Sequence, residues 1–157
     1  MRILVFSDSH NDSKSISKVM KRFYPDCAIH LGDGSLDLFA LEKEYPLTTF
    51  YYVKGTVDDF GEPDRIISLE GVSIFLSHEN KFEVKKDRDK INEAVRLNIQ
   101  IVLYGHTHVP EFFVNNGIIF MNPGSIGKEY GYRTFGLIDA FEGEYSCEVL
   151  FADLLIS

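Results

Sequence analysis

The sequence predicts a layered α/β fold, in which two β-sheets pack face to face and helices cover their outer faces. In the first half of the chain, short apolar runs alternate with segments of helical periodicity, which is typical of parallel strands joined by right-handed crossovers. In the second half, short strands follow one another with turn residues between them, which is typical of antiparallel pairing. The chain of 157 residues is long enough to bury about two thirds of its unfolded surface, so we expect one domain over residues 1–157.

The first half is expected to contain three strands and two helices. The strands are the runs RILVFS, CAIHL and TTFYYVKG, which are rich in apolar, β-branched and aromatic residues. After the first strand, apolar residues recur at helical spacing: Ile16, Val19, Met20 and Phe23. After the second strand, a shorter helix is expected to bury one face: Leu36, Phe39 and Ala40. Pro25 and Pro46 close these two segments.

The second half opens with a hairpin formed by RIISL and VSIFLSH around Glu70 and Gly71. A helix follows, and one stripe of it is expected to face the sheet: Ile91, Ala94, Val95 and Asn98. The helix leads into the strand IQIVLYG, and four further strands come after it: EFFV, IIFMN, TFGLIDA and YSCEVLFA. Turn residues at 115–117 and 142–144 separate these strands.

The composition narrows the classes of function. The formal net charge of −8 argues against stable binding to nucleic acid or to an anionic membrane, both of which need a basic face. It does not exclude a phosphate ester as substrate, because bound cations can reverse the local potential. Cys27 and Cys147 lie far apart in strand patterns and are expected to be free thiols, as in a reducing compartment. With no signal peptide and no membrane span in view, we expect a cytoplasmic protein.

Histidines and aspartates gather where the predicted strands end. The candidates are Asp8 and His10 after the first strand, Asp33 after the second, His78 after VSIFLS, and His106 and His108 after IQIVLYG. Ligands bind outside the carboxyl ends of strands in open α/β sheets, and residues i and i+2 of an extended segment point to the same side. Mixed oxygen and nitrogen ligands suit divalent cations, and six such groups are enough for two of them.

Each residue alone has a structural explanation. Asp8 and Asp33 could cap the helices that follow them, and His78 could be a hydrogen-bonded core histidine. The ordered set, with every member at a strand end, favours a metal site instead.

The ordered motifs resemble those of the calcineurin-like metallophosphoesterases, in particular the small bacterial and archaeal phosphodiesterases of the YfcE type. They are Asp8-Ser9-His10, Gly32-Asp33, Gly55-Thr56-Val57-Asp58, Ser77-His78, Gly105-His106-Thr107-His108 and Asn122-Pro123-Gly124-Ser125. The resemblance spans residues 3 to about 140 and implies a four-layer αββα sandwich, with two mixed sheets face to face. It also implies that one metal is held by Asp8, His10 and His108, and the other by His78 and His106, with Asp33 bridging both. Mn²⁺ is the expected ion, and Fe, Zn, Ni, Co and Mg also suit such ligands.

The third of these motifs departs from the family pattern. Thr56 stands where the family has an asparagine ligand, so the resemblance implies a weaker second metal site. Val57 stands where many members have a histidine, or this branch often a cysteine, that assists proton transfer to the leaving group. Asp58 matches the pattern, and both Asp58 and Asn122 are expected to lie near the ligands or to face the phosphate.

The resemblance implies a metal-dependent phosphodiesterase that uses a metal-bridging hydroxide to hydrolyse a small phosphate ester. The alternative is a binding or scaffold protein that keeps the fold with weakened or lost catalysis, as the retromer subunit of this fold does. Thr56 and Val57 favour the alternative, and the six retained ligands favour the enzyme. The exposed faces of the second sheet would allow a homo-oligomer. A Rossmann-type or P-loop nucleotide binder is excluded, because the turn SDSHND has no glycine cradle for phosphates.

Overall fold

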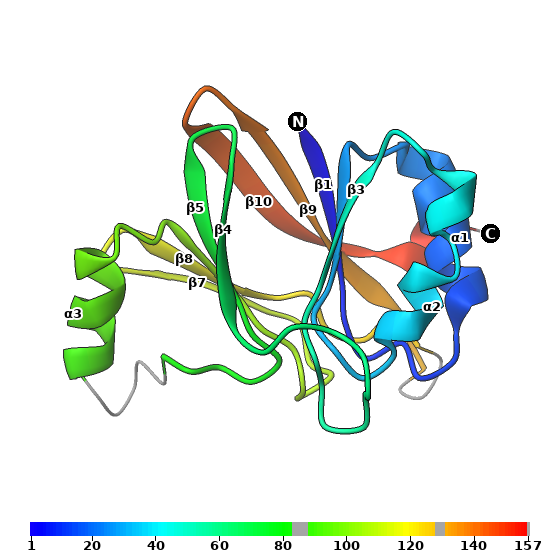
Figure 1. Cartoon of the computed structure of the whole chain (residues 1–157), viewed down its shortest axis with the longest axis horizontal. Helices are drawn as coiled ribbons and strands as arrows, with labels where there is room; N and C mark the ends of the chain where they lie inside the picture. Colours follow the sequence, from blue (N-terminus) through cyan, green and yellow to red (C-terminus); the bar gives the residue numbers. More distant parts are fainter. Residues whose placement is uncertain (83–87, 128–130, 157) are drawn as a thin grey trace.

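The computed structural model describes residues 1–82, 88–127 and 131–156. It contains two five-stranded mixed β-sheets that pack face to face, with helices on their outer sides (Figure 1). This arrangement confirms the predicted four-layer sandwich.

The first sheet has the strand order β10-β9-β1-β2-β3. Its three parallel strands are β1 (Arg2–Phe6), β2 (Cys27–His30) and β3 (Thr49–Tyr52). The helices α1 (Ser13–Phe23) and α2 (Ser35–Phe39) make the crossovers between them, and a short 3₁₀ turn (Glu42–Glu44) precedes β3. The antiparallel strands β9 (Thr134–Phe141) and β10 (Glu144–Phe151) complete the sheet, and a second 3₁₀ turn (Ala152–Leu154) follows. The carboxyl ends of β1 and β2 therefore meet at one edge of this sheet.

The second sheet has the strand order β4-β5-β6-β8-β7. The hairpin of β4 (Arg65–Leu69) and β5 (Val72–Leu76) lies at one side, and the hairpin of β7 (Glu111–Asn115) and β8 (Ile118–Asn122) lies at the other. Between them β6 (Ile101–Leu103) runs parallel to β5 and β8. The helix α3 (Arg88–Arg96) connects β5 to β6. The carboxyl ends of β5 and β6 consequently point the same way.

Three apolar clusters fill the spaces between the four layers. Alternate residues of the strands face opposite sides, so Ile3 of β1 joins the cluster between the sheets while Leu4 faces α1. On the outer side of the second sheet, α3 packs through Ile91 and Ala94 onto Phe120 of β8. Each central strand is thus buried on both faces, as its apolar run predicts.

The predicted buried face of α2 was wrong, and that of α3 was partly wrong. In α2, Leu36, Phe39 and Ala40 are all exposed, and Leu38 and Leu41 are buried instead. The helix has only five residues, so its apolar pattern was too short to fix which face is buried. In α3, Ile91 and Ala94 are buried as predicted, whereas Val95 and Asn98 are exposed. Asn98 has already left the helix, with a left-handed φ of 53°.

Cys27 and Cys147 are free thiols, as predicted, and burial raises the pKa of each to about 12. Among the residues that the structure describes, no helix combines the length and apolar character needed to cross a membrane.

Candidate metal centre

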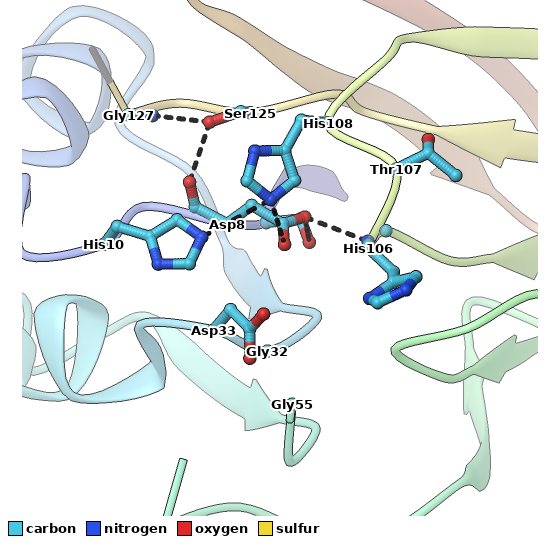
Figure 2. A network of polar contacts seen from close by, with 12 residues as sticks. Asp8, His10, Gly32, Asp33, Gly55, His106, Thr107, His108, Ser125 and Gly127 are labelled. Carbon is cyan, nitrogen blue, oxygen red and sulfur yellow. Dashed lines mark hydrogen bonds and ion pairs between the residues drawn. The ribbon is translucent and has the colours of Figure 1, made fainter. Parts of the chain in front are cut away.

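The first set of candidate ligands consists of Asp8, His10 and His108. Asp8 and His10 follow β1 of the first sheet, while His108 follows β6 of the second. The His108 Nε2 atom lies 3.2 Å from Asp8 Oδ1 and 3.4 Å from His10 Nε2. One ligand atom from each residue lies within 4.8 Å of the other two, so the three atoms surround a common point (Figure 2).

The second set consists of Asp33, His78 and His106. Asp33 follows β2 of the first sheet, while His78 and His106 follow β5 and β6 of the second. The His78 Nε2 atom lies 3.3 Å from Asp33 Oδ2 and 3.3 Å from His106 Nδ1. Asp33 and His78 are buried, whereas His106 is exposed, so this set opens to solvent on one side.

The two sets adjoin each other at the same rim of the sandwich. The backbone N–H of His106, from the second set, donates to Asp8 Oδ2, from the first, at 3.1 Å. Each set takes ligands from both sheets, which brings together the strand ends that the sequence singled out. The bridging role of Asp33 stays a prediction.

The surroundings of Asp8 leave one carboxylate oxygen available to a cation. Its Oδ2 accepts from Ser7 Oγ at 2.5 Å and from the backbone of His106. Its Oδ1 is buried, accepts no hydrogen bond from the described residues, and faces His108 Nε2. Burial raises the pKa of Asp8, and the Ser7 hydroxyl and the nearby histidines oppose that rise. A buried carboxylate oxygen turned toward imidazole nitrogens is what a divalent cation requires of its ligands.

His78 is also oriented for ligation. Its Nδ1 lies 2.8 Å from the carbonyl oxygen of Leu31, which can only accept a hydrogen bond. The ring proton therefore lies on Nδ1, and the lone pair of Nε2 points toward Asp33 and His106. Both sets of residues thus fit a metal ion in the chemistry and the orientation of their donor atoms.

The backbone at these residues is strained. Five of the six candidates have a left-handed φ, between 43° and 70°: Asp8, His10, Asp33, His106 and His108. Non-glycine residues rarely adopt this conformation, and residues that do so cluster at functional sites. Gly105 shows how tightly the rim is packed, because a Cβ atom there would overlap the Ser7 hydroxyl that supports Asp8.

The helix-capping roles that the sequence left open for Asp8 and Asp33 are not observed. The N-cap of α1 is Asp12, whose side chain accepts from the backbone of Ser15, and not Asp8. The N-cap of α2 is Gly34, and not Asp33. The aspartates are therefore free to act as ligands.

Comparison with known families identifies the chain. The model of the calcineurin-like phosphoesterase superfamily domain matches residues 1–142. The chain belongs to this family.

Individual relatives resemble most of the chain. A probable metallophosphoesterase of Bacillus subtilis is 30% identical over 132 residues, which cover 80% of this chain and 75% of the relative. A phosphodiesterase of Methanocaldococcus jannaschii is 24% identical over 167 residues, which cover 92% and 96%. Among solved structures, Vps29 of Entamoeba histolytica in complex with Zn²⁺ superimposes with a TM-score of 0.69 at 20% identity, covering 97% of this chain and 99% of that one. At this identity the Vps29 structure shows the shared fold.

The loop of residues 55–58 sets this calcineurin-like phosphoesterase apart from the family pattern. The Thr56 side chain is exposed. The Val57 side chain is 70% exposed, and its backbone N–H donates to Asp33 Oδ1 at 3.0 Å. A ligand role for Thr56, in place of the family's asparagine, stays a prediction.

Asp58 and Asn122 contact the backbone that carries the ligands. Asp58 accepts from the backbone N–H groups of Asp33, Gly34 and Gly55. Burial would raise the pKa of Asp58, but these three donors lower it below the ordinary value. The Asn122 side chain is buried and donates to the Gly105 carbonyl and to Thr107 Oγ1, each at 3.0 Å. Asp58 therefore holds the turn that carries Asp33, and Asn122 holds the turn that carries His106.

Three serines and a histidine near the ligands were not predicted as part of the site. Ser7 supports Asp8, Ser125 donates to the Asp8 carbonyl at 2.7 Å, and Ser9 contacts His30 at 2.9 Å (Figure 2 shows Ser125). His30 is fully buried, and its Nδ1 atom accepts from the Gly32 N–H at 3.1 Å. Ser7, Ser9 and Ser125 lie within or beside the quoted motifs, and this proximity was the available signal.

Proposed function

We propose that the chain is a divalent-metal-dependent phosphodiesterase that hydrolyses a small phosphate ester in the cytoplasm. One observation carries the proposal: two sets of three carboxylate and imidazole ligands, drawn from both sheets, adjoin at one rim. The kinship with a phosphodiesterase of Methanocaldococcus jannaschii supports the same class of reaction.

The residues of the chain would hold two Mn²⁺ ions and leave one side of the second set open. Two divalent ions, when bound, lower the pKa of a coordinated water and neutralise the charge of the phosphate group. The exposed side of His106 gives the ester access to this point. Val57 offers no proton to the leaving group, and the Asp58 carboxylate of the same loop is engaged by three backbone N–H groups.

The test combines metal analysis with hydrolysis. Gently purified protein is expected to contain two divalent ions per chain and to hydrolyse bis-p-nitrophenyl phosphate when Mn²⁺ is added. Because an activated phenolate leaves without protonation, we expect a dialkyl phosphate to react far more slowly. Equal rates on the two diesters would contradict this account of the site, and absence of bound metal and of Mn²⁺-stimulated hydrolysis would refute the function.

The second candidate function is a binding protein that keeps the metal-site fold with weakened catalysis. The observation that favours it is the 55–58 loop, in which the side chains of Thr56 and Val57 are exposed to solvent. Restoring an amide ligand with Thr56→Asn separates the candidates. A large gain in Mn²⁺-dependent hydrolysis would identify a weakened enzyme, whereas hydrolysis that stays at background in both proteins would favour the binding protein.

A further inference from the structure

The turn formed by residues 32–34, which carries Asp33, has an unusual backbone. Its three residues all have a left-handed φ, of 105° at Gly32, 54° at Asp33 and 128° at Gly34. Glycine adopts this conformation freely, but Asp33 does so at a steric cost. Such a turn persists only when the surrounding structure holds it in place.

Two side chains hold this turn by receiving its three consecutive backbone N–H groups. The N–H of Gly32 donates to His30 Nδ1 at 3.1 Å. The N–H of Asp33 donates to Asp58 Oδ2 at 2.6 Å, and that of Gly34 donates to Asp58 Oδ1 at 2.9 Å. A buried turn would otherwise leave these donors unsatisfied.

Asp58 is itself fixed against the turn. Its Oδ2 also accepts from the Gly55 N–H at 2.9 Å, which closes the 55–58 loop. Gly55 packs so closely that a Cβ atom there would overlap the backbone nitrogen and carboxylate of Asp33. From the same loop, Val57 donates its backbone N–H to Asp33 Oδ1. The loop therefore contacts both the backbone and the carboxylate of Asp33.

His30 is fixed from its other ring nitrogen. Because Nδ1 accepts from Gly32, the proton of the neutral ring lies on Nε2, which donates to Ser9 Oγ at 2.9 Å. The Ser9 hydroxyl in turn donates to Asp37 Oδ2 at 2.5 Å, on α2. His30 is fully buried, so its orientation is set by these contacts and not by solvent.

We propose that Asp58 and His30 are positioning residues, which hold the 32–34 turn in its strained conformation and so place the Asp33 carboxylate beside His78 and His106. The inference rests on the proposed metal centre. Neither residue belongs to a set of candidate ligands, and each acts through the backbone of the turn.

This role accounts for which residues of the 55–58 loop match the family pattern. Gly55 and Asp58 match the family pattern, and both are needed at Asp33. Gly55 leaves room for Asp33 because it has no Cβ atom, and the Asp58 carboxylate accepts from the Asp33 N–H. The two departing positions, Thr56 and Val57, have exposed side chains, and Val57 contributes only its backbone. The loop therefore holds Asp33 in place although Thr56 and Val57 differ from the family's residues at these positions.

The sharpest test is Asp58→Asn, with Asp59→Asn as the matched control. An asparagine can accept hydrogen bonds on one side only, so it must lose either the Gly34 donor or the Asp33 and Gly55 donors. The neighbouring Asp59 is exposed, and its substitution removes the same charge. Titration of the metal-free protein with Mn²⁺ is expected to show at least one ion binding about 10- to 100-fold more weakly in Asp58→Asn than in wild type. Both ions are expected to weaken where Asp33 bridges them. Asp59→Asn is expected to bind both ions as wild type does.

Two further measurements test the proposal without catalysis, and the first of them also needs no metal. Amide hydrogen exchange in EDTA is expected to be faster at Asp33 and Gly34 in Asp58→Asn. The second compares His30→Asn with His30→Leu. The asparagine keeps an acceptor close to the place of Nδ1 for the Gly32 N–H, so His30→Asn is expected to bind Mn²⁺ at the Asp33 site more tightly than His30→Leu. If Asp58→Asn does not fold, this His30 pair decides the question.

The proposal is overturned if Asp58→Asn binds both ions with wild-type affinity. It is also overturned if amide exchange in Asp58→Asn accelerates throughout the chain and not at Asp33 and Gly34, which would indicate a general structural role. It is also overturned if His30→Asn and His30→Leu bind the ions alike. Failure of the proposed function looks different: a wild-type protein that binds two Mn²⁺ ions but hydrolyses no diester would refute the phosphodiesterase and leave these binding comparisons valid.

Discussion

The two carboxylate oxygens of Asp8 lie in different surroundings. One is held by the Ser7 hydroxyl and the His106 backbone, and the other faces His108 without a hydrogen-bond donor. This asymmetry fixes the carboxylate before any cation arrives. A ligand arranged in this way loses little conformational entropy on binding.

Asp8→Asn is expected to remove one of the two metal ions. The amide oxygen would take the place that accepts from Ser7, and the amide N–H₂ would then point at the cation. We expect Mn²⁺-dependent hydrolysis to fall at least about 100-fold and the bound metal to fall from two ions to one. Asp64→Asn, at an exposed position, is the matched control and should change neither quantity. Two tightly bound ions in Asp8→Asn would rule out Asp8 as a ligand.

His30 gives the fold a dependence on pH. Full burial lowers its pKa from 6.5 to about 3, although the nearby Asp58 carboxylate opposes this shift. Between these values the unfolded chain binds a proton that the folded chain does not, so stability is fully present above pH 6.5 and is lost as the pH falls toward 3. In EDTA, His30→Asn is expected to show a shallower fall of the unfolding midpoint with acidification than wild type. Parallel curves for the two proteins would show that His30 does not titrate in this way.

At the scale of the element, α2 separates two leucines that lie only two positions apart. Leu38 is fully buried in the cluster beneath α1 and α2, whereas Leu36 is 58% exposed. Leu38→Ala is expected to lower the free energy of unfolding by about 2–5 kcal/mol, and Leu36→Ala by less than about 0.5 kcal/mol. Urea unfolding of the two variants measures both values. Equal losses would mean that the helix buries the other face.

The helix α2 also shows where prediction from the sequence stopped. Long apolar runs such as RILVFS fixed the strands, because burial on both faces leaves few polar positions. Five helical residues cover little more than one turn, so periodicity could not tell which of their apolar side chains faces inward.

The candidate ligands could be predicted because ligation needs particular side chains at strand ends. The support given to them could not be predicted in the same way. Asp58 and His30 receive backbone N–H groups, and such donors are present at nearly every residue, so no sequence pattern identifies the ones that matter. Likewise, the exposure of Thr56 follows from the path of the 55–58 loop, which depends on its contacts with Asp33.

At the scale of the whole molecule, each set of ligands links the two sheets. A cation bound at either set would therefore connect layers that otherwise meet through the apolar cluster between them. Binding to the folded state alone stabilises it by about 2.7 kcal/mol when the free ion is at 100 times its dissociation constant.

Chelation is accordingly expected to lower thermal stability. For a chain of this length, that free energy corresponds to a fall of about 5–10 °C in the midpoint when EDTA replaces Mn²⁺. Differential scanning calorimetry of both forms measures the shift. The double variant Asp8→Asn/Asp33→Asn, which lacks a carboxylate in each set, should unfold at one temperature with and without EDTA. If the unfolding midpoint of the wild-type protein is the same with Mn²⁺ and with EDTA, no bound ion stabilises the contact between the sheets.

At the end of the sandwich opposite the candidate ligands, the two sheets are joined by a backbone hydrogen bond. There the turns of the β4–β5 and β9–β10 hairpins lie side by side, and the Gly143 N–H donates to the Glu70 carbonyl at 2.7 Å (Figure 1). This contact joins two backbone groups, so neither acid nor a chelator removes its donor or its acceptor. Chelation is therefore expected to loosen the sandwich first at the end that carries the histidines, while the end at Glu70 and Gly143 stays closed.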